Sequence, residues 1–240
     1  MSSNDRAVAS APLHHHYHAT MTPYPLIPAD DHEYGAACDA RWAKLQDGPM
    51  LDDKLLRMRA VATTHRTEER ASDILDRADK SRNARSKIEW LHKAIDLGVA
   101  PSEGLAACRK GCVHCCHISV DVGESEARAI QKASGRRLNL KAGLNGDDAE
   151  QRIPERQRRA LGVSCAFLAR GACSIYVARP FACRAQVNVD EDELLCRLTT
   201  AEDGYMPRVP YLNTEKYKAA CSVILGNGER FADIRDWFPN

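Results

Sequence analysis

The chain has 240 residues, of which 44% are hydrophobic and 28% charged, with 34 basic and 33 acidic side chains and a formal net charge of +1. This length can bury a sizeable core, and the balanced charge gives no reason to expect a nucleic acid or an anionic membrane as partner. No apolar run approaches the roughly 20 residues of a membrane span, and no secretory signal is visible. We therefore expect a globular cytoplasmic protein.

The N-terminal 35 residues are expected to form a disordered tail. They are polar or rich in histidine and proline, and they show no helical period. His14, His15, His16 and His18 could bind a metal ion weakly, but a solvated tail is the simpler interpretation. Residues 1–35 are therefore set apart from the folded chain.

Residues 36–100 are predicted to be a helical segment. Pro49 suits the first turn of a helix, with Asp47 before it as a candidate cap. Apolar residues then recur at three- and four-residue steps as far as Ile95, and Gly98 and Pro101 end the helical run. Helices of this length with mixed charges are typical of a packing scaffold.

The remaining chain alternates short elements with irregular stretches. We expect a short strand, three helices, a loop and an irregular stretch, in this order along the chain: strand 118–122, helix 124–134, loop 141–149, helix 153–162, irregular region 165–196 and helix 214–225. The predicted fold class is mainly α with short β-strands, a helical scaffold around an irregular cysteine-rich region. That region spans residues 101–200, and residues 201–240 form a C-terminal helical extension packing on it.

Eight of the ten cysteines fall into two groups. The first group occupies nine residues, and the second follows after a gap: Cys108, Cys112, Cys115 and Cys116, then Cys165, Cys173, Cys183 and Cys196. Ten cysteines in a reducing compartment favour metal or redox chemistry over disulfides. Thiolates two or three residues apart in a tight loop can converge on one metal ion. Cys38 and Cys221 lie outside both groups, and each is interpreted as a small buried hydrophobic residue.

The adjacent pair Cys115 and Cys116 constrains the kind of site. Neighbouring side chains point in different directions, so both are not expected to bind one four-coordinate ion. The pair could divide between two metal ions, serve one iron–sulfur cluster, or leave one thiol free. His114 and His117 could be ligands, although a supporting or surface position is favoured. All-thiolate coordination suits zinc and iron–sulfur centres equally.

Two other kinds of site share part of this spacing. Radical S-adenosylmethionine enzymes use C-x3-C-x2-C, but they usually carry an aromatic residue where this chain has His114, and they need repeated strand–helix units. A thioredoxin-like site would use the C-x-x-C spacing of Cys112 and Cys115, but the expected βαβ context is missing upstream. Neither interpretation explains the other cysteines.

The two motifs together resemble the YkgJ-like cysteine-cluster family, a CxxCxxCC-type domain described as zinc- or iron-chelating. The resemblance covers roughly residues 100–200. The first motif is GCVHCCH with Cys108 before it, and the second is C-AFL-x4-C-SIY-x2-RP-x2-CR. It implies that the two cysteine groups, eight thiols in all, chelate the metal. It implies little about a reaction, although flagellin lysine methylases form a related group.

Three residues of the second motif have two open interpretations. Tyr176 could simply pack, with Arg179 paired to a carboxylate. Alternatively, Arg179 or Arg184 could offset the negative charge of the thiolates and tune the metal site from behind its ligands.

The sequence therefore predicts a protein that binds zinc or iron, with an iron–sulfur cluster among the options. The alternative is an iron–sulfur-dependent enzyme, such as a protein methylase or a redox modifier. A third interpretation is a zinc-stabilised interaction module, in which the metal only folds the loops. The sequence leaves open whether the protein is an enzyme and which protein partner it has.

Overall fold

The computed structural model describes residues 24–200, 207–226 and 228–239. These residues form helices connected by short 3₁₀ turns and two small antiparallel β-ribbons, which confirms the predicted mainly α class. The four histidines of the predicted tail lie outside the described residues. Residues 24–35 lie within them: Ile27 pairs with Thr199, and the first helix begins at His32. This part of the predicted tail is therefore folded against the rest of the chain.

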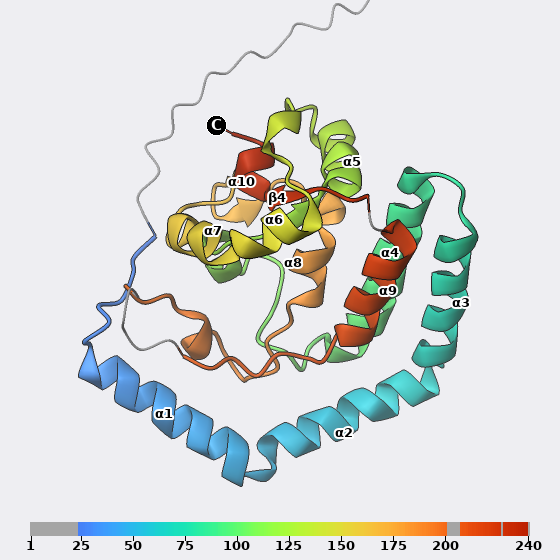
Figure 1. The fold of residues 1–240 in the computed structure, drawn as a ribbon. Coiled ribbons are helices and arrows are strands. Elements are labelled where there is room, and N and C mark those ends of the chain that lie inside the picture. The colour runs from blue at the N-terminus through green and yellow to red at the C-terminus, as the bar shows by residue number, and fades with distance from the viewer. Residues whose placement is uncertain (1–23, 201–206, 227, 240) are drawn as a thin grey trace, which may run out of the picture.

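Four helices make up the N-terminal half: α1 (His32–Asp47), α2 (Pro49–Thr64), α3 (Thr67–Lys80) and α4 (Ala84–Val99). Figure 1 shows α1 and α2 as a bent arm along one side of the molecule, with α3 turning back beside α4. Pro49 stands in the first turn of α2, as predicted. The prediction that Asp47 caps this helix is wrong, because Asp47 belongs to the last turn of α1 and Gly48 is the capping residue.

Helix α4 lies between the scaffold helices and the cysteine-rich half. It buries Ile88, Leu91 and Ile95, and it contacts α3, α5, α8 and α9. Its C-terminal turn lies so close to α9 (Glu215–Leu225) that a Cβ atom on Gly98 would be 2.2 Å from the Tyr217 hydroxyl oxygen. Glycine at position 98 therefore permits the close approach of these two helices.

The cysteine-rich half consists of short elements. Its helices are α5 (Glu124–Ser134), α6 (Gly146–Gln151), α7 (Ile153–Ala160), α8 (Phe181–Ala185) and α10 (Ile234–Trp237). Its strands are β1 (Asp121–Gly123), β2 (Leu168–Ala169), β3 (Ala172–Cys173) and β4 (Phe231–Asp233). Its 3₁₀ turns are η1 (Ala100–Ser102), η2 (His114–His117), η3 (Leu140–Ala142), η4 (Tyr176–Ala178) and η5 (Leu194–Cys196).

The helices predicted at 124–134, 153–162 and 214–225 are confirmed as α5, α7 and α9. The strand predicted at 118–122 lies further along the chain, where β1 covers Asp121–Gly123. The predicted loop at 141–149 contains part of η3 and the start of α6. Strand β4 and helix α10 were not predicted, since three- and four-residue elements leave little periodicity in the sequence.

The C-terminal segment closes the core of this half. Strand β4 pairs antiparallel with β1, and Asp233 accepts a hydrogen bond from the Val120 backbone N–H at 2.8 Å. The fully buried Trp237 donates its indole N–H to the Val122 carbonyl at 2.7 Å. Trp237 belongs to a hydrophobic cluster that also includes Ile130 and Phe238. Cys165, Cys173 and Cys183 pack against this cluster. In the described ranges, no helix combines the length and apolar character needed to cross a bilayer.

Candidate metal centre

The first cysteine group lies on a tight loop that ends in the 3₁₀ turn η2. Gly111 has a φ of +94°, a left-handed conformation that side chains rarely adopt, so this position favours glycine. The N–H of Cys112 donates to the Arg109 carbonyl at 3.0 Å, and that of Cys116 to the Val113 carbonyl at 2.9 Å. The backbone of this loop is therefore fixed by its own hydrogen bonds.

The four later cysteines come from separate elements. The N–H of Cys165 donates to the Cys116 carbonyl at 2.7 Å, which joins the two groups directly. Cys173 ends β3, beyond a turn in which Arg170 and Gly171 both have positive φ. Cys183 lies on α8, and Cys196 ends η5.

Six of the eight thiols line one cavity of about 70 Å³: Cys112, Cys115, Cys116, Cys165, Cys173 and Cys183. Phe167, Ile175 and Ile234 supply apolar wall, and Tyr176 and Arg179 also contribute to the lining. The fold thus brings together thiols from both groups, which are almost fifty residues apart between Cys116 and Cys165. The other two thiols, Cys108 and Cys196, lie beside this cavity, and Asn188 donates a hydrogen bond to each of them.

Asn188 connects Cys108 and Cys196. Its backbone N–H donates to the Cys108 Sγ at 3.2 Å, and its side-chain amide donates to the Cys196 Sγ at 3.2 Å. Asn188 is fully buried, Cys196 is half-buried and Cys108 is exposed, so the hydrogen bond to Cys196 is the better shielded from water. Sequence reasoning missed this residue, because one asparagine in a polar segment carries no local signal.

All ten cysteines lie in the described ranges, and no disulfide joins any of them. Across residues 24–200, 207–226 and 228–239, no three Cys, His, Asp or Glu side chains are grouped closely enough to hold a metal ion. Eight soft sulfur donors in two adjoining sets nevertheless match the ligand preference of zinc and iron–sulfur centres. The donor chemistry therefore fits a thiolate-bound metal.

Burial shapes the acidity of these thiols. It raises the pKa of Cys108, Cys112, Cys165, Cys173 and Cys183, and it raises the pKa of Cys196 to about 12. Cys115 is the exception, since a hydrogen bond from Cys116 lowers the pKa of Cys115 and raises that of Cys116. Cys115 is therefore the thiol that ionises most readily in this group.

The two arginines of the second motif have different surroundings. The Arg179 guanidinium lies over the Tyr176 ring, 4.3 Å from its centroid, and its Nε is buried with no hydrogen-bond partner. Its positive charge partly offsets the burial that raises the pKa of Cys108 and Cys173. Arg184 instead pairs with Asp96 and donates its Nε–H to the Arg179 carbonyl at 2.9 Å. Arg179 thus faces the thiols, and Arg184 supports it.

The two histidines of the first motif do not line the cavity. His114 hydrogen-bonds through Nδ1 to the Tyr24 hydroxyl, and His117 Nε2 lies 3.2 Å from the Ser164 Oγ. The Tyr24 ring also lies against His117, with 4.3 Å between ring centroids. This agrees with the supporting position favoured from the sequence. The N-terminal segment thus reaches the cysteine loop.

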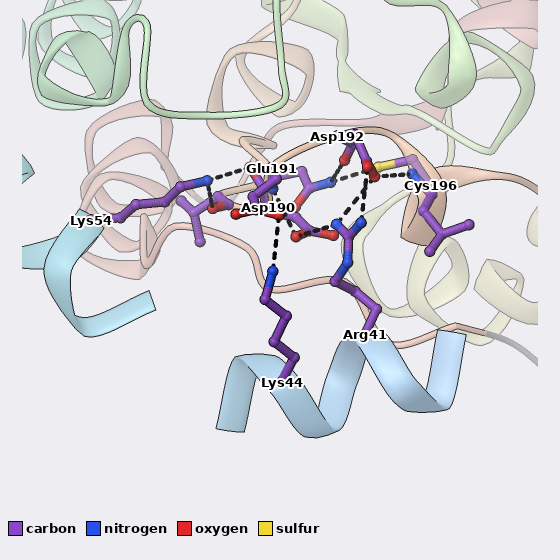
Figure 2. A network of polar contacts seen from close by, with 10 residues as sticks. Arg41, Lys44, Lys54, Asp190, Glu191, Asp192 and Cys196 are labelled. Atoms are coloured by element: carbon purple, nitrogen blue, oxygen red, sulfur yellow. Dashed lines mark hydrogen bonds and ion pairs between the residues drawn. The ribbon is translucent and has the colours of Figure 1, made fainter. Parts of the chain in front are cut away.

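Helices α1 and α2 hold the loop that carries Asn188 and Cys196. Figure 2 shows Arg41 reaching Asp190 and Asp192, with Lys54 donating to the loop backbone. The Arg41 Nη1 lies 2.9 Å from the Asp190 Oδ1, and Asp190 is fully buried. Lys44 pairs with Glu191 at 3.4 Å, where both side chains are exposed. The scaffold therefore contacts the site through the 189–192 loop.

The two remaining cysteines lie away from the cavity. Cys38 is fully buried beside Tyr34 and Leu195, and Cys221 packs between α9 and the scaffold helices. Burial raises the pKa of Cys221 to about 12. Cys38 agrees with the interpretation as a small buried hydrophobic residue, whereas Cys221 is only half-buried.

The comparison with known families adds one match. Residues 107–208 match the family model CxxCxxCC, whose description is "Putative zinc- or iron-chelating domain". No match to the chain was found among curated proteins or among solved structures. The matched stretch contains all eight clustered cysteines, and helices α1 to α4 lie outside it. Residues 107–208 of this chain are therefore similar to the CxxCxxCC cysteine-cluster family, which is the resemblance that the two motifs predicted.

Proposed function

We propose that this chain binds zinc or iron through the thiolates of its eight clustered cysteines, Cys108, Cys112, Cys115, Cys116, Cys165, Cys173, Cys183 and Cys196. The observation that carries the proposal is the cavity lined by six thiols from both cysteine groups. Thiolates gathered at one place repel one another unless a cation neutralises them, and Zn²⁺ and iron are the cations that thiolate sets prefer. The positive charges near these sulfurs are those of Arg109, Arg179 and Arg235, too few to balance eight thiolates.

The family description names metal chelation and no reaction, which favours metal binding over the enzymatic alternative. A cytoplasmic location is part of the proposal, and an iron–sulfur cluster is one form in which the iron could be bound. The reducing compartment would keep the thiols available to the metal. Tyr176, Arg179 and Arg184 would then support the ligands rather than bind the metal themselves.

Purification without oxygen, followed by metal analysis and a visible absorption spectrum, tests the proposal. We expect zinc in a colourless protein, or iron with the absorption of an iron–thiolate centre. Cys112→Ser and Cys183→Ser, which change one thiol of each group, should each lower the bound metal. The control is Cys221→Ala, which removes a thiol outside the cavity and should keep full metal content. Protein that contains neither metal and takes up none on addition contradicts the proposal.

A further inference from the structure

We infer that the eight thiols form two four-sulfur metal centres, divided between the adjacent residues Cys115 and Cys116. The first centre consists of Cys108, Cys112, Cys115 and Cys196, and the second of Cys116, Cys165, Cys173 and Cys183. The inference rests on the proposed function and makes it specific. Each of the two centres would bind one divalent cation through its four sulfurs.

The turn that carries the adjacent pair is the first reason. Cys115 and Cys116 lie within η2, a 3₁₀ turn from His114 to His117. Such a turn has three residues in each revolution, so consecutive side chains project about 120° apart. The two thiols still hydrogen-bond to each other, so this pair lies where the two sets of sulfurs meet. One ion on each side of the pair can then take one of these two sulfurs.

Three thiols of the second centre pack against the same hydrophobic cluster. Cys165, Cys173 and Cys183 all pack against the hydrophobic cluster that contains Val122, Ile130 and Trp237. The 2.7 Å hydrogen bond from Cys165 to the Cys116 carbonyl brings Cys116 to the same place. These four thiols line the cavity, and Cys112 and Cys115 of the first set line its other part, so the two centres adjoin. Of the clustered cysteines, Cys165, Cys173 and Cys183 are the ones packed against the hydrophobic cluster.

The first centre is defined by Asn188. Its two donors reach Cys108 and Cys196 at 3.2 Å each, and neither of these thiols lines the cavity. One residue thus holds a thiol from each cysteine group at a place beside the second centre. Cys112, which lies on the same tight loop as Cys108, is the third member.

The backbone decides how the adjacent pair divides. The Cys116 carbonyl accepts the hydrogen bond from Cys165, which places Cys116 in the second set. Cys115 therefore completes the first set.

The test is a titration of the reduced full-length chain with Co²⁺ and, separately, with Zn²⁺. Tetrahedral thiolate coordination gives Co²⁺ intense visible bands, and Zn²⁺ content is measured by mass spectrometry of the intact protein. We expect saturation at two ions per chain. Cys108→Ser with Cys196→Ser should leave one ion, and so should Cys165→Ser with Cys173→Ser. Combining all four changes should leave none.

The control variant is Cys38→Ala with Cys221→Ala, which removes two thiols outside both sets and should still bind two ions. Far-ultraviolet circular dichroism of each variant checks that the helices remain. Wild-type saturation at one ion, or loss of all metal in either double variant, overturns the two-centre inference and leaves the proposed function standing. No binding of either ion by the wild type overturns the proposed function as well.

Discussion

The guanidinium of Arg41 on α1 lies 2.9 Å from the carboxylate of Asp190, a fully buried residue on the loop before Cys196. The Nη2 of the same guanidinium forms a second ion pair, with the Asp192 carboxylate, also at 2.9 Å. Arg41 belongs to the scaffold outside the family-matched segment, whereas Asp190 lies two residues from Asn188. This contact makes the N-terminal helices part of the support of the cysteine site.

Arg41→Ala is therefore expected to destabilise the protein and loosen the Cys196 loop. It leaves the buried Asp190 carboxylate without its counter-charge, so the free energy of unfolding should fall by about 2–4 kcal/mol. Urea denaturation of the metal-loaded protein measures the change. Lys44→Ala is the control, because its exposed pair with Glu191 should contribute less than about 1 kcal/mol. Equal effects of the two changes would contradict a supporting role for Arg41.

Asn188→Ala should reduce the free energy of Zn²⁺ binding more than it reduces the free energy of unfolding. The change removes the amide that donates to the Cys196 Sγ, while the backbone N–H can still reach Cys108. Loss of a hydrogen bond to a metal ligand typically lowers affinity roughly 10- to 100-fold, and competition with a chelator measures this for Zn²⁺. Asn188→Asp should weaken binding further, because it adds negative charge beside the thiolates.

The control for Asn188 is Gln186→Ala. Gln186 lies on the same segment, but its side chain donates to the Tyr211 hydroxyl instead of a sulfur. Its replacement should leave the Zn²⁺ affinity within about twofold, a difference of roughly 0.4 kcal/mol or less. If Gln186→Ala and Asn188→Ala weaken the affinity alike, the effect comes from the segment and not from the amide.

Gly98→Ala tests the close packing of α4 on α9. The new methyl group would meet the Tyr217 hydroxyl at 2.2 Å, so the helices must separate or Tyr217 must move. Overpacking of this kind should lower the free energy of unfolding by about 1–3 kcal/mol, measured by urea denaturation. Gly35→Ala in α1 has open space around the new Cβ and should instead stabilise the helix by roughly 0.5–1 kcal/mol. If Gly98→Ala leaves the free energy of unfolding unchanged, the Tyr217 side chain can move aside at little cost.

Metal-free protein should lose stability as the pH rises above about 9. Burial raises the pKa of Cys196 and of Cys221 from 9.0 to about 12 in the folded chain. The unfolded chain therefore releases these protons first, and between pH 9 and 12 ionisation favours the unfolded state. Urea midpoints at pH 8 and pH 10 after chelator treatment measure the effect. A higher midpoint at pH 10 would contradict it.

Metal-loaded protein should respond to pH in the opposite sense. Thiolates bind the metal and thiols do not, so each proton added at low pH competes with the ion. Metal content after dialysis should therefore fall as the pH is lowered from 8 to 5. Unchanged metal content at pH 5 would argue against thiolate ligands.

Local sequence signals predicted much of the scaffold and the chemistry of the site. The apolar repeats of the N-terminal half, Pro49 at a first turn and the boundaries of α5 were readable, because periodicity and capping act over a few residues. The two cysteine motifs pointed to the family model that residues 107–208 match, and to a metal bound by thiolates. Their side-chain types alone restrict the ligand chemistry.

Only the tertiary structure placed the contacts between distant segments. The pairing of β1 with β4, the reach of Asn188 to two sulfurs and the ion pair of Arg41 with Asp190 join residues far apart in the chain. Such contacts depend on how whole elements pack, and elements of three or four residues leave no periodic signal. The sequence by itself thus determined which atoms could bind a metal, and the packing of the core determined which thiols lie beside one another.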